Sequence, residues 1–157
     1  MIKKYLSEVT YGGIDGIITT LAIIAGSKGA KLSNKITLTL GIANVVADGF
    51  SMGISSYLAE KARNVSKNPY YVGLVTFLSF VIIGLIPVMP YVITIIKNKK
   101  EDNKSFIYSI ILTGILLFII GFSRGKIMDG IETLIIGGIA GAIAYNLSKY
   151  IKNKLSA

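Results

Sequence analysis

The sequence contains no cysteine and no histidine among its 157 residues. Without cysteine there are no disulfides and no thiolate chemistry, and without histidine there are no histidine–metal sites and no Ser–His catalysis. A metal ion held by such a chain needs carboxylates, amides, hydroxyls, methionine or backbone carbonyls. The acidic residues also lack a phosphate-binding loop beside them. We therefore expect neither an enzyme nor a resident cofactor.

Charge is also scarce, because Asp, Glu, Lys and Arg make up only 16% of the chain while apolar residues make up 52%. A soluble domain usually has about 25% charged residues. The charges that are present gather near residues 61–67, 97–104 and 149–154, and long stretches between them carry none. This pattern is typical of membrane spans joined by short polar loops.

The net charge of +9 is compatible with nucleic-acid binding as well as with a membrane protein. The lysines and arginines, however, stand at the ends of apolar runs, where cations meet lipid headgroups. No basic face with interleaved aromatic residues is present. We expect membrane lipid as the surrounding partner and no nucleic acid.

Five apolar runs approach or exceed the length of about 20 residues that a transmembrane helix needs. They cover residues 9–26, 36–58, 70–96, 106–122 and 131–151. Pro87 and Pro90 should kink or break the third run near its far end. The runs predict an all-α integral membrane protein with five transmembrane helices in a single transmembrane domain, residues 1–157.

A signal peptide is the competing interpretation of the first run. Lys3 and Lys4 precede an apolar stretch that ends in small residues at 25–27. Asp15 and three early glycines do not suit the apolar core of a signal peptide, so we favour a transmembrane helix.

Two carboxylates, Asp15 and Asp48, fall inside the first two runs. A carboxylate in a span costs about 2.5–3.5 kcal/mol on insertion scales, so it faces a polar cavity or a partner. No Lys or Arg lies inside the first four runs, and Lys149 stands at the far end of the fifth. This favours a functional role over a structural ion pair; a structural hydrogen bond is the alternative. Four other carboxylates are expected in solvated loops or at helix ends: Glu101, Asp102, Asp129 and Glu132.

The second run adds a pattern around its acid. Asn44, Asp48 and Met52 are spaced by four and share one face of a helix. Methionine alone would usually be core or lipid-facing filler. A thioether in register with oxygen ligands suits a borderline ion such as Fe²⁺ better than Mg²⁺ or Ca²⁺.

Depth follows from the rise of about 1.5 Å per residue in a helix. If the first two helices are antiparallel, Asp15 and Met52 both lie about 9 Å deep from the same side. Asp48 lies one turn deeper and Asn44 deeper still, while Glu8 lies at the mouth. Glu60 is a possible second entrance residue. The result is a predicted pathway of ligands leading into the membrane.

Two segments now resemble a known family. YGGIDGIITTLAIIAG at 11–26 and GIANVVADGFSMG at 41–53 are similar to the first two spans of the vacuolar iron transporter family. The IPVMPY segment at 86–91 and the small-residue fifth run also fit. The resemblance covers most of the chain.

The resemblance implies a five-helix protomer, a two-fold homodimer with a central pathway, and movement of Fe²⁺ or Mn²⁺ against protons. It gives pathway roles to Asp15, Met52 and Glu8. Asn44 stands where some plant members carry a glutamate, with Asp48 one turn later. Many relatives insert a Glu-rich metal-binding domain after the second span, where this chain has only residues 61–69.

We therefore expect a proton antiporter that moves Fe²⁺ or Mn²⁺, or both, out of the cytoplasm, with the metal as substrate. The alternatives are a non-transporting membrane scaffold or assembly protein, and a small proton-coupled exporter of organic cations. A scaffold would tolerate Asp15→Asn, and an organic-cation site would place more aromatic residues around its acid.

The expected location is the cell membrane, as a multi-pass protein. The resemblance places the N-terminus in the cytoplasm. The positive-inside rule favours the opposite orientation, because ten of the 17 basic residues would then lie outside.

Overall fold

The computed structural model describes residues 2–63, 67–97 and 103–156, and all regular structure in these ranges is helical. The helices are a 3₁₀ turn η1 (Ile2–Tyr5), α1 (Leu6–Gly29), α2 (Asn34–Arg63), α3 (Pro69–Gly84), a 3₁₀ turn η2 (Ile86–Val88), α4 (Met89–Ile96), α5 (Lys104–Phe122) and α6 (Ile127–Leu155). Five helical segments are long and apolar enough to cross a membrane, with α3 through α4 counted as one. The predicted fold class, all-α with five transmembrane helices, is confirmed.

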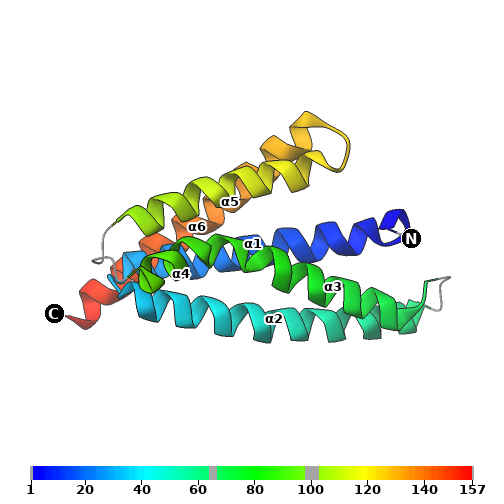
Figure 1. Cartoon of the computed structure of the whole chain (residues 1–157), viewed down its shortest axis with the longest axis horizontal. Helices are drawn as coiled ribbons and strands as arrows, with labels where there is room; N and C mark the ends of the chain where they lie inside the picture. Colours follow the sequence, from blue (N-terminus) through cyan, green and yellow to red (C-terminus); the bar gives the residue numbers. More distant parts are fainter. Residues whose placement is uncertain (1, 64–66, 98–102, 157) are drawn as a thin grey trace.

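The third span is interrupted near Pro87 and Pro90, as the sequence predicted. Helix α3 ends at Gly84, η2 contains Pro87, and α4 starts beside Pro90 with a change of direction that Figure 1 shows. Proline lacks the amide donor that a continuous helix needs. The hydroxyl of Ser109 on α5 donates to the carbonyl of Pro87 at 2.5 Å, which satisfies one backbone acceptor at the break.

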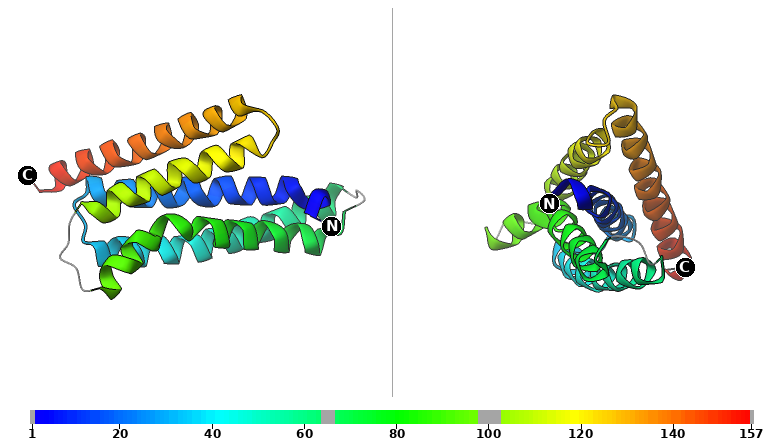
Figure 2. Two further views of the ribbon diagram at one scale, coloured as in Figure 1. Left: turned by 45° about the horizontal axis from the view of Figure 1, so that its top comes forward. Right: turned by 90° about the vertical axis from the view of Figure 1, so that its right-hand side faces the viewer.

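Helix α1 is the central element of the bundle. It packs against α2, α3, α5 and α6, and the end-on view in Figure 2 shows the other helices arranged around it. A segment packed on so many sides has the role of a transmembrane helix in this fold, which favours that interpretation over a signal peptide.

Helices α1 and α3 approach each other backbone to backbone. A β-carbon at Gly12 would lie 2.6 Å from the carbonyl oxygen of Thr76, and one at Gly16 would lie 2.5 Å from that of Phe80. Only glycine fits such contacts, and small residues of this kind let membrane helices pack closely. The backbone on either side of Asp15 is therefore held firmly against α3.

The outward surface of the bundle is apolar. Large side chains such as Phe50, Ile82 and Ile143 are exposed along its length. An exposed apolar surface of this extent is what a lipid bilayer requires. The two termini lie at opposite ends of the bundle (Figure 1), as an odd number of spans demands.

Candidate functional site: a charged entrance and a deeper carboxylate pair

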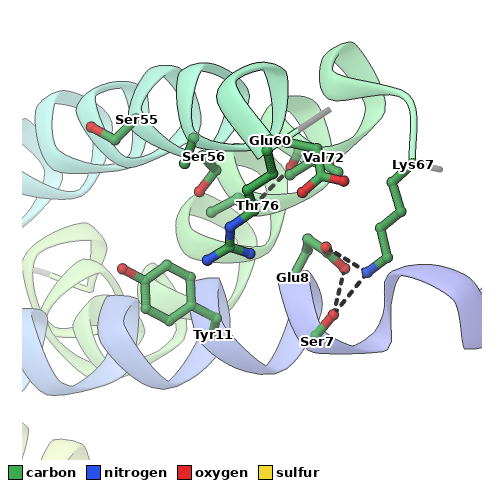
Figure 3. A pocket seen from close by; sticks show the side chains of 11 residues that line it. Ser7, Glu8, Tyr11, Ser55, Ser56, Glu60, Lys67, Val72 and Thr76 are labelled. Carbon is green, nitrogen blue, oxygen red and sulfur yellow. Dashed lines mark hydrogen bonds and ion pairs between the residues drawn. The ribbon is translucent and has the colours of Figure 1, made fainter. Parts of the chain in front are cut away.

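An open cavity of about 600 Å³ lies at the end of the bundle that holds the start of α1. Its lining comes from α1, the last turns of α2, and α3 with the residue Lys67 before it (Figure 3). The polar and charged residues that line it are Ser7, Glu8, Tyr11, Ser55, Ser56, Glu60, Arg63, Lys67 and Thr76. We call this space the entrance cavity.

Glu8 in the entrance cavity is held by an ion pair. Its Oε1 lies 2.8 Å from the ammonium of Lys67, and its Oε2 accepts a hydrogen bond of 2.8 Å from Ser7. Lys67 also donates to the Ser7 hydroxyl at 3.1 Å. The structure thus places Glu8 at the mouth with a cation already beside it. Sequence reasoning missed this partner, because the two residues are 59 positions apart in the chain.

Glu60 is the buried acid of the entrance cavity. It lies within α2, not beyond its end, and only 8% of the residue is exposed. Figure 3 shows its carboxylate directed into the space that Glu8 borders. The structure therefore brings the two residues together.

The glycines that follow Asp15 and Asp48 both pack against one residue of α3. A β-carbon at Gly16 would lie 2.5 Å from the carbonyl of Phe80, and one at Gly49 would lie 3.2 Å from the Phe80 ring. Asp15 and Asp48 directly precede these two glycines, so both acids stand on helical turns that pack next to the same residue of α3. Neither carboxylate has a hydrogen bond or ion pair with another described residue.

The two aspartates differ in their surroundings. Asp15 is half-buried and borders a second cavity of about 610 Å³, lined mainly by α1 and by Arg124. Asp48 is exposed on the outer side of α2, so the expectation that both acids are buried is wrong for a single protomer. The physical reason is that α2 packs mainly on α3 and leaves its opposite side uncovered.

Met52 and Asn44 flank Asp48 along α2. Met52 is 9% exposed and packs with Val45 and Phe80, so its thioether lies in the protein interior. It is one helical turn away from Asp48. Asn44 is half-buried, and its Nδ2 has no hydrogen-bond partner among the described residues. The helix face predicted from the sequence, which carries Asn44, Asp48 and Met52, therefore lies at the border between the packed and the exposed sides of α2.

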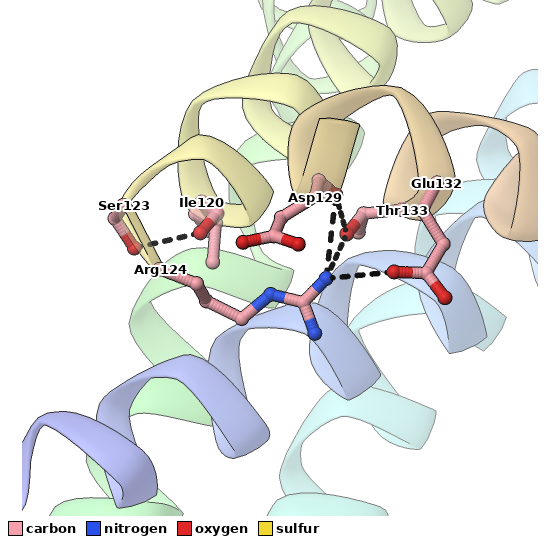
Figure 4. Close-up of polar contacts among 6 residues, drawn as sticks. All are labelled: Ile120, Ser123, Arg124, Asp129, Glu132 and Thr133. Atoms are coloured by element: carbon pink, nitrogen blue, oxygen red, sulfur yellow. Dashed lines mark hydrogen bonds and ion pairs between the residues drawn. The ribbon is translucent and has the colours of Figure 1, made fainter. Parts of the chain in front are cut away.

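The other acids are at the periphery. Arg124 pairs with Glu132 at 3.2 Å and reaches the backbone carbonyl of Asp129 at 3.4 Å, where α6 begins (Figure 4). The carboxylate of exposed Glu132 thus has a local structural partner, whereas half-buried Asp129 is bonded through its backbone carbonyl. Glu101 and Asp102 lie outside the described residues.

No group of three or more acidic side chains close enough to hold a metal ion occurs within residues 2–63, 67–97 and 103–156. In one protomer, Glu8 and Glu60 line the same cavity, and Asp15 and Asp48 each precede a glycine that packs against Phe80. A metal ion here would need neutral donors such as Met52, or ligands from a second chain.

Comparison with known proteins gives a consistent result. The model of the VIT family matches residues 6–66 and 59–149. The vacuolar iron transporter of Plasmodium falciparum is 25% identical, with 98% of this chain and 85% of that protein covered. The vacuolar iron transporter of Toxoplasma gondii is 24% identical (96% and 75% covered), and vacuolar iron transporter 1 of Arabidopsis thaliana is 24% identical (96% and 87%).

These alignments also show a difference in length. The alignment with the Toxoplasma gondii protein has 227 positions, against 157 residues in this chain, so the relative carries at least 70 residues that this chain lacks. The two segments matched by the family model meet at 59–66, which indicates that the extra residues lie between the counterparts of α2 and α3. Because the matches span residues 6–149, the chain belongs to the VIT family.

Proposed function

We propose that this protein is a transporter that moves a divalent transition metal ion, Fe²⁺ or Mn²⁺ or both, out of the cytoplasm in exchange for protons. The name shared by the relatives supports iron as a substrate. The donor set supports the same class of ion, because Met52 offers a soft thioether near the hard oxygens of Asp15 and Asp48.

The observation that carries the proposal is that Asp15 and Asp48 each precede a glycine that packs against Phe80. Two acidic residues thus stand in membrane-spanning helices beside the same residue of α3, and neither forms an ion pair with a described residue. Such an arrangement is costly unless protons or a cation neutralise it. A divalent ion supplies both of the charges that are needed.

The same pair suggests how protons are coupled. A carboxylate must be deprotonated to bind metal, so metal binding releases a proton and metal release takes one up. If Asp15 and Asp48 are protonated when the pathway holds no metal, each cycle exchanges metal for protons. We propose Asp15 and Asp48 as the proton carriers.

A homodimer is part of the proposal. Asp48 is exposed on α2 at a depth where a charge facing lipid is unfavourable. A second copy packed over this side of α2 would remove Asp48 from lipid and line a central pathway between the protomers. Asn44, whose amide nitrogen is buried without a partner, would contribute a further ligand to that pathway.

In this proposal Glu8 and Glu60 form the cytoplasmic entrance, and the protein lies in the cell membrane with its N-terminus in the cytoplasm. Reporter fusions to each terminus test the orientation. A cytoplasmic C-terminus would overturn the assignment and would agree with the distribution of lysines.

Metal uptake into proteoliposomes tests the function itself. Flux of Fe²⁺ and Mn²⁺ should depend on an imposed pH gradient and should be lost in Asp15→Ala and strongly reduced in Met52→Ala. Glu132→Gln, at an exposed peripheral acid, is the matched control. Absence of flux in the wild-type protein, or equal flux in all variants, would contradict the proposal.

A further inference from the structure

The entrance cavity holds a cation of its own, the ammonium of Lys67. We infer that Lys67 is a tethered competitor for divalent cations and that Glu60 is the carboxylate that first captures an arriving ion. This inference rests on the proposed function and adds to it a device that sets the affinity and charge selectivity of the entrance.

Glu60 supports the capture role by its burial and its lack of a partner. The residue is 92% buried, since 8% is exposed, and it borders a cavity open to the end of the bundle. It makes no hydrogen bond or ion pair with any described residue. A buried charge without a partner is unfavourable, so the site gains free energy when a cation enters.

Neutral oxygen donors surround this carboxylate. Ser55, Ser56 and Thr76 line the same cavity, and Tyr11 adds a phenolic oxygen. Hydroxyl and carboxylate oxygens are suitable ligands for Mn²⁺ and similar ions. The cavity of about 600 Å³ also has room for an ion that retains part of its hydration shell.

Lys67 is positioned by the start of α3. The next residue, Asn68, caps this helix by accepting a hydrogen bond of 3.0 Å from the amide of Tyr70, and Pro69 is its first residue. The Lys67 ammonium also lies 5.8 Å from the centre of the Tyr5 ring. The cap and the ring therefore help to hold the ammonium beside Glu8.

The charges explain why a divalent ion can replace this ammonium. Lys67 brings one positive charge and neutralises Glu8 alone, whereas a divalent ion between Glu8 and Glu60 neutralises both. A dissolved monovalent ion offers no more charge than Lys67 and must compete with a group held at high effective concentration. Arg63 also lines the cavity and adds to the positive potential that an entering ion must overcome. The entrance thus favours divalent ions and holds them weakly enough to pass them on.

Binding of Mn²⁺ to the purified full-length protein, followed by electron paramagnetic resonance of the free ion, tests the inference. Titrations are made in the wild-type chain and in an Asp15→Asn background, which removes a deeper carboxylate. Lys67→Gln should bind Mn²⁺ about fivefold more tightly, and Glu60→Gln about tenfold more weakly, as expected for the loss of one competing or one attracting charge.

Lys61→Gln is the matched control, because it removes the same charge from an exposed lysine next to Glu60 that does not line the cavity. Its affinity should change less than about twofold. Equal tightening in Lys61→Gln and Lys67→Gln would mean a general effect of surface charge and would overturn the inference. Unchanged or weaker binding in Lys67→Gln would overturn it as well.

Lys67→Ala provides a second neutral variant, and monodisperse elution in detergent shows whether each variant is folded. If neither Lys67 variant folds, unchanged Mn²⁺ affinity in Glu60→Gln still contradicts the inference. Transport separates it from the proposed function. Flux that needs Asp15 but does not respond to Lys67 or Glu60 defeats only the inference, whereas the expected Mn²⁺ affinities without any flux defeat only the proposed function.

Discussion

The α1–α3 half of the bundle and the α5–α6 half are packed in the same way but carry different polar groups. In both halves glycines bring backbones together: a β-carbon at Gly16 would lie 2.5 Å from Phe80, and one at Gly121 would lie 2.6 Å from Asp129. The first half, however, contains carboxylates at membrane depth, while the interior of the second contains hydroxyls such as Ser109 and Thr113. Close packing by small residues is therefore common to the whole fold, and the acids distinguish the candidate pathway.

Two buried hydroxyls of the second half are bonded to the backbone, whereas that of Thr113 has no partner among the described residues. Ser109 donates to the Pro87 carbonyl and Thr133 to the Asp129 carbonyl. Bonds of this kind stabilise helices and their contacts. The aspartates of the first half have no such partners among the described residues, which is why we assign chemistry to that half and structural support to the other.

The largest expected effect comes from disrupting the packing around Asp15. Gly16→Leu would force a side chain into the Phe80 backbone and should cost more than about 3 kcal/mol. We expect little folded protein, measured as the monodisperse fraction in detergent. Gly138→Leu in α6 is the matched control, because a β-carbon there meets nothing within 4 Å. An equal loss of folded protein in Gly16→Leu and Gly138→Leu would show that the close contact of Gly16 with Phe80 is not what limits the side chain at this position.

A smaller effect, confined to transport, is expected for Asp48→Asn. Removing one of the two charges should lower metal flux about tenfold, equivalent to about 1.4 kcal/mol of binding. The variant should remain folded, since the side chain is exposed in the protomer. Proteoliposome flux measures the loss, with Glu132→Gln as the control for charge alone. Unchanged flux would remove Asp48 from the pathway and leave Asp15 as the only carrier.

Ser109→Ala tests the support given by the second half. The hydroxyl is fully buried and bonds the carbonyl at the break between α3 and α4. Its loss should destabilise the protein by about 1–2 kcal/mol, seen as a lower midpoint of thermal unfolding in detergent. Metal affinity per folded molecule should not change. A change in affinity without a change in midpoint would give α5 a role in binding that we do not assign to it.

The smallest effect is expected for Arg124→Gln. Its pair with Glu132 is largely exposed, with side-chain exposures of 41% and 61%, and exposed pairs contribute less than about 1 kcal/mol. The thermal midpoint should shift by no more than a few degrees, and less at high salt. A large fall in flux would instead mean that Arg124 acts on Asp15 through the cavity that both residues border.

Much of the architecture could be predicted from the sequence because hydropathy and proline placement are local signals. Apolar runs of sufficient length predicted the membrane spans, and Pro87 and Pro90 predicted the break in the third. Spacing by four placed Asn44, Asp48 and Met52 on one side of a helix. It left open which of them face the interior, since that depends on the neighbour against which α2 packs.

The partners of the charges could not be predicted, because they come from distant parts of the chain. Lys67 is far from Glu8 in sequence, and only the packing of α1 beside the start of α3 brings them together. The burial of Glu60 follows from the continuation of α2 to Arg63, which the apolar run did not reveal. Charged residues at the end of a run gave no sign that one of them would be enclosed.

The sequence by itself determined that this protein is helical and that it spans a membrane. It also determined that any metal ion must be bound by carboxylates, by other oxygen or amide donors, or by the sulfur of methionine. Composition decides these matters, because a bilayer admits only apolar helices with internally bonded backbones and because histidine and cysteine are absent. The tertiary structure alone decided which charges meet. It packed the helical turns of Asp15 and Asp48 against Phe80, paired Glu8 with Lys67 and left Glu60 enclosed without a partner among the described residues. Electrostatic contacts depend on distance in space and not on position along the chain.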